Sequence, residues 1–385
     1  MDRAAATARL ARWLGPWAGA ERAPGAVTRS THRLREGRTP GQHATSPPGD
    51  GPSVLDVHVY ERERGARLGE WVVVPGLHFL GPDDPRLDRF CRILAHAGFR
   101  VTAPALPAFL DLLVDRSLPD DLEQAVRWAT ARSRPGERPS LFSISFGSWP
   151  ALEVAARLGA GVDGVVTFGG YAEFRSVVRF CCDGVMRAPS GDLRLARDPL
   201  NCPALFLNLQ RWLDAPTPEV EQAAHGWRRM IYRTWGRMEL KAPGRLEPFV
   251  REEEHALPPP ARALFRLGCG LGPETTAAVE AALERAGAAL SVFDPGPALA
   301  RLACPVVICH GRDDDVIPWG EAPKLRQALS ARGRARVLLT GMYGHTGSAL
   351  PTPGALAREA WTLLAMARAL ASAGQLERVV GPARA

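Results

Sequence analysis

Strand-like and helix-like patterns alternate along the first half of the sequence. Short apolar runs that are typical of buried strands lie at 71–74, 99–103 and 161–168. Amphipathic patterns that are typical of helices with one buried face lie at 84–97 and 120–132. Alternating apolar residues at 53–60 predict an antiparallel edge strand that opens the sheet. Because strand–helix–strand units join parallel neighbours through right-handed crossovers, this order predicts a mostly parallel sheet between two layers of helices.

A serine lies at the turn between one predicted strand and the helix that follows it. The strand-like segment 141–144 is followed by Ser145-Phe146-Gly147, and a helix-like pattern begins directly afterwards. A serine hydroxyl becomes a useful nucleophile when a sharp turn exposes it and when the following helix points its amides and positive dipole end at it. Gly147 supplies one small residue of such a turn, whereas Ser143 stands where glycine is the usual choice. Serine–glycine clusters are also common in loops, so the pentapeptide alone does not establish a catalytic residue.

An acidic loop and a histidine each follow a further predicted strand in the C-terminal half. The apolar run at 304–309 leads into the loop His310-Gly311-Arg312-Asp313-Asp314-Asp315-Val316-Ile317-Pro318. The run at 336–340 leads into a glycine-rich turn that contains His345. Because the carboxyl ends of parallel strands lie along one edge of a sheet, a serine, an acid and a histidine that each follow a strand can converge there.

The order and spacing of these three segments resemble the α/β-hydrolase family, over roughly residues 53–175 and 297–370. The resemblance implies a three-layer α/β-hydrolase fold, a mostly parallel central sheet and a helical cap insertion. It also implies a catalytic triad of Ser145 as nucleophile, Asp314 as acid and His345 as base. Asp314 matches because it lies three residues after Gly311 and four before Pro318. Asp313 and Asp315 remain alternatives, since spacing alone does not separate three consecutive acids.

The resemblance further implies an oxyanion hole built from backbone amides. The strand at 71–74 breaks at Pro75-Gly76, and by position Leu77 offers one N–H group, while Phe146 offers the other. His78 is a second candidate donor in the same turn. We expect His78 and Tyr171 at the substrate-binding surface, although a partly exposed loop histidine is an equally good interpretation of His78.

The composition of the chain suggests one catalytic domain with additions. We expect a flexible or docked extension at 1–50, a core at 51–170 and 298–373, a helical cap at 171–297 and a tail at 374–385. Within the cap, the helical pattern from Trp227 to Met238 places Trp227 and Trp235 on one face and Arg229 and Arg233 on another. Packing of the tryptophans over the site is the favoured interpretation, and contact with a membrane surface or an acidic ligand is the alternative.

Charge and cysteine content exclude several classes of function. The formal net charge is +7, but eight arginines and four acids lie in residues 1–50, so the rest of the chain is only weakly basic and we expect no nucleic-acid partner. Seven scattered cysteines argue against a disulfide framework and suggest a reducing, cytoplasmic location. The sequence lacks an apolar run long enough to span a membrane, and we expect no metal or other cofactor. The oligomeric state is not indicated.

These patterns predict a serine hydrolase that cleaves an ester, thioester or amide of a small organic substrate through an acyl-enzyme on Ser145. A carboxylic ester is the expected bond, and the cap aromatics and arginines favour an apolar or acidic substrate. An acyltransferase would use the same triad with a different acceptor. A catalytically silent binding protein is the third hypothesis, because Ser143 departs from the glycine of the usual turn and the cap is large.

Overall fold

The computed structural model describes residues 2–15, 22–35, 54–189, 191–329, 334–341 and 353–380. Its centre is an eight-stranded sheet with the strand order β1-β2-β4-β3-β5-β6-β9-β10. The strands are β1 (Val27–Arg35), β2 (Val54–Arg62), β3 (Gly69–Val74), β4 (Phe99–Pro104), β5 (Ser140–Ile144), β6 (Val165–Phe168), β9 (Val306–Gly311) and β10 (Ala335–Thr340). β2 pairs antiparallel with β1 and with β4, and the remaining pairs are parallel. The mostly parallel sheet predicted from the sequence is therefore confirmed.

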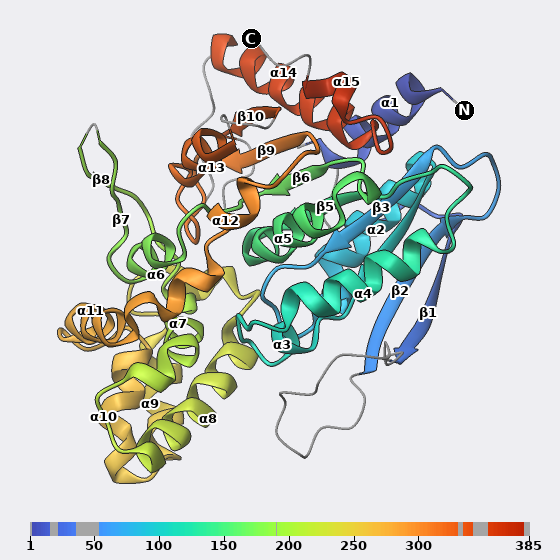
Figure 1. Ribbon diagram of the computed structural model, residues 1–385. Coiled ribbons are helices and arrows are strands. Elements are labelled where there is room, and N and C mark those ends of the chain that lie inside the picture. Colours follow the sequence, from blue (N-terminus) through green and yellow to red (C-terminus); the bar gives the residue numbers. More distant parts are fainter. Residues whose placement is uncertain are drawn as a thin grey trace.

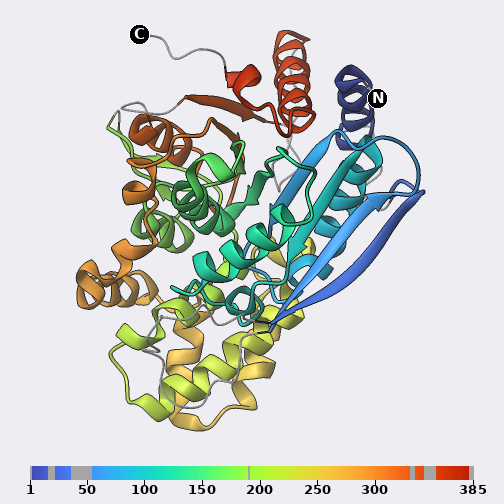
Figure 2. The same cartoon turned by 45° about the vertical axis from the view of Figure 1, so that its right-hand side comes forward.

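Helices cover both faces of this sheet (Figures 1 and 2). One face packs against α4 (Leu118–Thr130), α5 (Ser148–Leu158) and α13 (Glu321–Leu329). The other face packs against α1 (Arg3–Leu14), α2 (Pro85–Ala97) and α14 (Pro353–Leu370). Every residue of β3, β4 and β9 is buried, which explains why these strands have continuous apolar sequences. The three-layer arrangement expected for an α/β-hydrolase fold is present.

Part of the N-terminal extension belongs to the central sheet and the core, whereas the sequence-based boundary placed the start of the core at residue 51. β1 is the edge strand, so the predicted edge strand at 53–60 is instead the second strand, β2. β1 was missed because its sequence, VTRSTHRLR, is polar at most positions, as suits an edge strand. α1 packs on α2 and α14, and Arg3 donates hydrogen bonds to the carbonyls of Ala371 and Ala373. Part of the extension is thus docked on the helices that cover one face of the sheet.

A helical insertion follows β6 and forms the cap, as predicted (Figure 1). It comprises α6 (Phe174–Asp183), the short hairpin β7 (Val185–Met186) and β8 (Leu193–Arg194), α7 (Cys202–Leu209), α8 (Thr217–Thr234), α9 (Glu247–His255), α10 (Pro259–Gly268) and α11 (Thr275–Ala286). α12 (Gly296–Leu299) then leads back to β9. Trp227 is fully buried in the cap, where its indole N–H donates to the carbonyl of Phe265. Trp235 instead reaches the cavity described below.

The arginines of α8 pair within the cap. Arg229 contacts Glu253, and Arg233 contacts Glu252 and Glu253 of α9. Neither arginine lines the cavity near Ser145. The suggestion of an acidic substrate, which rested on these arginines, therefore loses its support.

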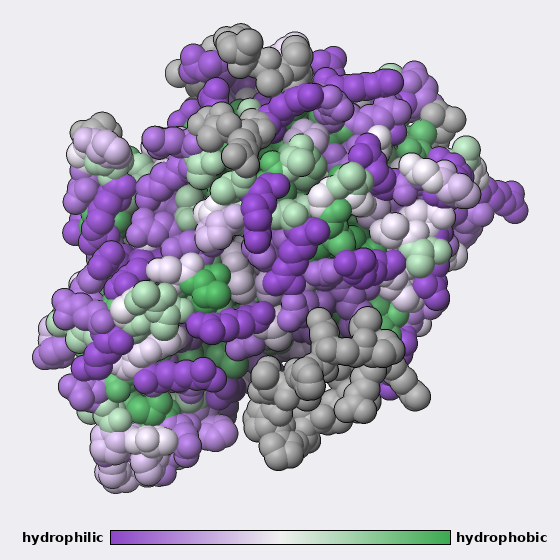
Figure 3. Space-filling view, in the orientation of Figure 1, coloured by the Kyte–Doolittle hydropathy of each residue, from purple (hydrophilic) through white to green (hydrophobic). Residues whose placement is uncertain are grey.

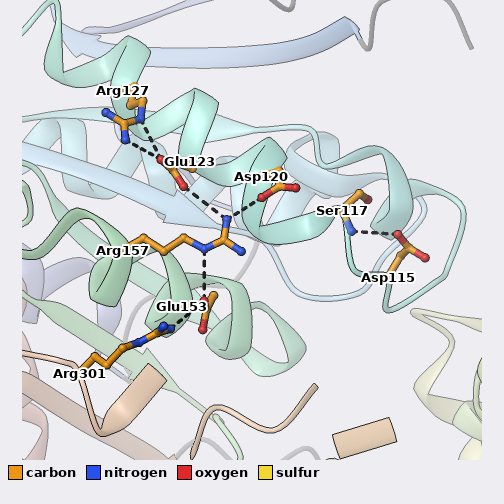
Figure 4. Close-up of polar contacts among 8 residues, drawn as sticks. All are labelled: Asp115, Ser117, Asp120, Glu123, Arg127, Glu153, Arg157 and Arg301. Atoms are coloured by element: carbon orange, nitrogen blue, oxygen red, sulfur yellow. Dashed lines mark hydrogen bonds and ion pairs between the residues drawn. The ribbon is translucent and has the colours of Figure 1, made fainter. Parts of the chain in front are cut away.

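A network of charged residues joins α4 and α5 at the surface (Figure 4). Arg157 lies 2.6 Å from Asp120 and 3.4 Å from Glu123 of α4, and 3.2 Å from Glu153 of its own helix. Glu153 also accepts a hydrogen bond from Arg301 at 3.1 Å. Each exposed pair contributes little alone, but the shared partners fix the helices that follow β4 and β5 relative to each other.

All seven cysteines are free and buried, as expected for thiols that fill core space. Across the described ranges, no helix is long and apolar enough to cross a membrane. The face of the molecule seen in Figure 3 is mainly hydrophilic, with hydrophobic residues in small separate patches.

Candidate active site

Ser145 has a strained backbone conformation. It follows the last residue of β5 and begins a short 3-10 helix, η2 (Ser145–Gly147), that continues into α5. Its φ angle is +52°, which residues other than glycine rarely adopt. Only Ala26 and Leu112 share this property among the described non-glycine residues. Such strain costs about 1–3 kcal/mol and persists where the surrounding structure enforces it, commonly at functional sites.

Glycines allow the loop after β3 to lie against this turn. A Cβ atom at Gly147 would lie 2.3 Å from the carbonyl oxygen of Pro75, so no side chain fits there without a backbone shift. A Cβ atom at Gly76 would lie 3.3 Å from the Ile144 carbonyl oxygen and 3.4 Å from the Cβ of Ser145. The close approach brings the loop that carries Leu77 next to the nucleophile candidate.

The two predicted oxyanion donors line the same cavity as Ser145. Leu77 and Phe146 are both half-buried there. Within the described part of the chain, the backbone N–H of neither residue donates a hydrogen bond to another residue. The role of these two amides as oxyanion donors stays a prediction.

Asp314 lies at the same edge of the sheet. Its Oδ1 atom accepts hydrogen bonds from the amides of Val316 and Ile317, each at 2.9 Å, so the loop itself orients the carboxylate. A Cβ atom at Gly169, just after β6, would lie 3.1 Å from Oδ2 of Asp314. The side chain is 13% exposed and lines the cavity.

The structure distinguishes the three consecutive acids. Asp313 is exposed and does not line the cavity. Asp315 is buried, and its Oδ2 atom lies 2.7 Å from Nζ of Lys241, which also lies 2.8 Å from Oδ2 of Asp198. Asp314 alone combines partial exposure with a position on the cavity wall, which favours it as the acid.

The cluster of Asp198, Lys241 and Asp315 was not anticipated. It ties two cap segments to the acid-bearing loop beside Asp314. Burial raises the pKa of the Asp198 carboxyl, and the Lys241 ammonium opposes that rise. A signal existed in the sequence, because Lys241 is one of only two lysines in the chain. Its two partners could not be identified without the fold.

His345 lies outside the described residues. β10, which precedes it, pairs with β9 so that Thr340 lies opposite Gly311. The chain therefore leaves β10 at the same edge of the sheet at which the acidic loop leaves β9. His310 is fully buried, and its Nε2 donates to the carbonyl of Ile317 at 2.9 Å, so it braces the acidic loop and does not line the cavity.

His78 lies on the cavity wall with both ring nitrogens near partners. Nδ1 accepts a hydrogen bond from the amide of Leu80 at 3.1 Å, and Nε2 lies 3.4 Å from Oδ2 of Asp84. Burial lowers the pKa of this imidazole. The ring stacks on Phe79 and lies 5.5 Å from the Trp235 ring, centroid to centroid, so it joins the loop after β3 to the cap.

Tyr171 lies behind the cavity wall. It is fully buried, its hydroxyl donates to the carbonyl of Phe293 at 3.0 Å, and burial raises its pKa. Its ring lies 5.6 Å from the Phe146 ring, centroid to centroid, and it does not line the cavity. Tyr171 thus packs beside Phe146, and its expected contact with a substrate stays a prediction.

One cavity of about 1120 Å³ brings these residues together. Of the predicted site residues, Ser145, Phe146, Leu77, His78 and Asp314 line it. Across the described ranges, no group of histidine, cysteine and acidic side chains could hold a metal ion.

Comparisons with known proteins give only distant likenesses. No protein-family model and no curated protein sequence matches the chain. Among solved structures, the acylaminoacyl peptidase of Pyrococcus horikoshii is 9% identical with a TM-score of 0.41, and 88% of this chain aligns with 40% of that one. This chain thus spans about two fifths of the length of the peptidase.

Two further solved structures, whose lengths are closer to the length of this chain, show a similarly distant likeness to it. A putative lipase of Acinetobacter baumannii is 14% identical with a TM-score of 0.40, and 90% of each chain aligns. A cold-adapted esterase from an Arctic intertidal metagenomic library is 12% identical with a TM-score of 0.40, over 91% of this chain and 98% of that one. The chain has the α/β-hydrolase fold. The features that support this assignment are the strand order of its sheet, the strained serine after β5 and the acidic loop after β9.

Proposed function

We propose that this protein is a serine hydrolase that cleaves a carboxylic ester through an acyl-enzyme on Ser145. The observation that carries the proposal is the φ angle of +52° at Ser145, on a strand-to-helix turn that lines a large cavity. An ordinary serine at the end of a strand has no reason to adopt this conformation. A nucleophile does, because the sharp turn presents its hydroxyl above the sheet edge.

In the proposed mechanism, His345 accepts the Ser145 proton as the hydroxyl attacks the ester carbonyl. Asp314 stabilises the imidazolium through Oδ2, since two backbone amides already hold Oδ1. The N–H groups of Leu77 and Phe146 stabilise the oxyanion of each tetrahedral intermediate, and one such donor is typically worth about 10²–10³ in turnover. The His345 imidazolium gives this proton to the departing alcohol, and the neutral imidazole then takes a proton from the water that attacks the acyl-enzyme and releases the acid.

Labelling with a fluorophosphonate tests this proposal, because such reagents phosphonylate activated serines. We expect one adduct on Ser145, none in Ser145→Ala and strongly reduced labelling in His345→Ala. Ser148→Ala is the matched control, since Ser148 is a fully buried serine three residues further along the same turn and helix. Labelling and hydrolysis of nitrophenyl esters should persist in this control. A folded wild-type protein that is not labelled would contradict the proposal.

A further inference from the structure

The cavity that contains Ser145 connects the two hydrophobic cores of the molecule. A central sheet normally separates the residues on its two faces, because successive side chains of a strand point to opposite sides. In β5, for example, Leu141 belongs to the core beneath α4 and α5, whereas Phe142 belongs to the core beneath α2 and α14. The cavity is lined by members of both cores, so it passes over the carboxyl edge of the sheet.

We call the two parts of this space the cap arm and the inner arm. The cap arm lies under the cap and is lined by α6 and α7 residues that include Phe174, Val178, Ala204 and Leu205. The inner arm lies between the sheet and α14, and its lining residues include Phe142, Val166, Phe168, Leu363 and Ala367. Ala11 and Leu14 of the N-terminal helix α1 also line the cavity on this side.

Ser145 lies where the arms meet. Ile144, its neighbour in β5, packs with the core on the α14 side, whereas Phe146 packs with the core on the cap side. Both neighbours line the cavity together with Ser145. A substrate whose carbonyl carbon is attacked by Ser145 therefore has one half directed to each arm.

The arms differ in polarity. Charged and amide side chains line the cavity on the cap side, among them Asp198, Asn208 and Lys241. Among the described residues on the side of α14 and the sheet, the lining side chains of the sheet and of α14 are apolar, and charged groups come from the start of α2, as Asp84, Arg86 and Arg89. The volume of about 1120 Å³ exceeds the roughly 300–1,000 Å³ typical of sites for small ligands.

We propose that the inner arm binds an unbranched hydrocarbon chain on the acyl group of the substrate, and that α1 forms part of its wall. This inference rests on the proposed hydrolase function and adds a substrate class, esters of medium-chain or long-chain fatty acids. The acyl group stays bound to Ser145 until water attacks, and its hydrocarbon chain needs apolar surroundings during that time. We therefore assign the acyl group to the apolar inner arm. The departing alcohol and the incoming water fit the cap arm, where polar side chains lie.

Chain-length selectivity tests the inference. Burial of one methylene group is worth about 0.8 kcal/mol, so kcat/KM should rise about fourfold for each carbon that the arm accommodates. We expect nitrophenyl octanoate and hexadecanoate to be better substrates than the butanoate. A flat profile across these esters would overturn the inference.

Matched substitutions assign the selectivity to one arm. Ala367→Phe fills the inner arm and should lower the hexadecanoate-to-butanoate ratio of kcat/KM by about 10²-fold, equivalent to three or four excluded methylenes. Ala204→Phe makes the same exchange in the cap arm and should leave this ratio unchanged, whatever it does to the individual rates. Arg368→Phe, at the adjacent exposed position of α14, should alter neither the ratio nor the rates. An unchanged ratio in Ala367→Phe would refute the assignment.

Binding to an inactive variant separates this inference from the proposed function. Displacement of a fluorescent fatty acid from Ser145→Ala by octanoate and hexadecanoate requires no catalysis. Affinity should rise with chain length and should fall when Ala367→Phe is added. If binding follows this pattern but Ser145 is never labelled, the hydrolase proposal fails and the apolar site stands. If labelling succeeds but binding ignores the second substitution, the inner-arm inference fails. Should Ala367→Phe not fold, Ala360→Phe repeats the test at an exposed cavity-lining position of the same helix.

Discussion

Substitution of Gly147 by alanine should damage the candidate site through the backbone alone. The φ angle of Gly147 is −63°, which alanine adopts without strain, so steric contact is the only expected problem. The new Cβ atom would lie 2.3 Å from the carbonyl oxygen of Pro75, whereas ordinary contacts begin at 3.4 Å. Relief requires the loop after β3 and the Ser145 turn to separate by about 1 Å, because backbone atoms lie on both sides.

The expected losses of stability and of reaction rate follow from the groups that this separation moves. Overpacking of a well-packed site costs about 1–3 kcal/mol of folding free energy. A misplacement of about 1 Å at a reacting centre costs about 10²-fold in rate. Because the loop after β3 carries Leu77, one oxyanion donor moves relative to Ser145, and we expect the loss mainly in kcat.

The assay compares two glycines of the same region. Fluorophosphonate labelling rates and thermal unfolding are measured for Gly147→Ala and for Gly161→Ala. A Cβ atom at Gly161 would have Leu158 Cβ as its neighbour at 3.7 Å, an ordinary contact. Gly161→Ala should therefore behave almost as wild type. The reasoning is refuted if Gly147→Ala labels at the rate of Gly161→Ala and unfolds at the same temperature.

Three other outcomes are expected. Asp314→Asn should slow labelling by up to about 10⁴-fold, as loss of the triad charge does elsewhere, while Asp313→Asn at the exposed neighbouring position should have little effect. Lys241→Met should remove the shared cation of the buried carboxylates of Asp198 and Asp315 and cost about 3–5 kcal/mol in urea unfolding, more than Lys324→Met, whose side chain is 34% exposed. Burial lowers the pKa of His58, His78 and His96, so protonation of these side chains favours the unfolded chain. The melting temperature should therefore fall as the pH drops below about 6.5. A melting temperature that does not change with pH in this range would contradict the prediction.

Elements with strong local signals could be predicted from the sequence. The helix expected at 84–97 is observed as Pro85–Ala97, because Asp84 caps its first turn, Pro85 opens it and Gly98 ends it in the left-handed conformation. The strand expected at 99–103 is observed as Phe99–Pro104, since its apolar run is buried on both faces. Helix capping and continuous burial of a strand each depend on a few neighbouring residues, so both can be recognised in the sequence.

Features that depend on distant partners could not be predicted. β1 is polar at most positions and is recognisable as a strand only through its pairing with β2. The partners of Lys241 lie at positions 198 and 315, too far apart in sequence for spacing to suggest them. The cavity that joins both cores depends on how α1, α2 and α14 pack over the sheet, which no single segment encodes.

The departure from glycine at Ser143 has a local explanation that leaves the Ser145 turn intact. Ser143 lies in β5 between Val74 of β3 and Thr167 of β6, and it does not share the positive φ of Ser145. The position is buried and does not require the conformational freedom of glycine. Its buried hydroxyl has no hydrogen-bond partner among the described residues, which costs about 1–3 kcal/mol. Because the strain and the close backbone contacts are located at Ser145 and Gly147, two and four residues further on, the substitution at Ser143 gives no reason to favour a silent binding protein over a hydrolase.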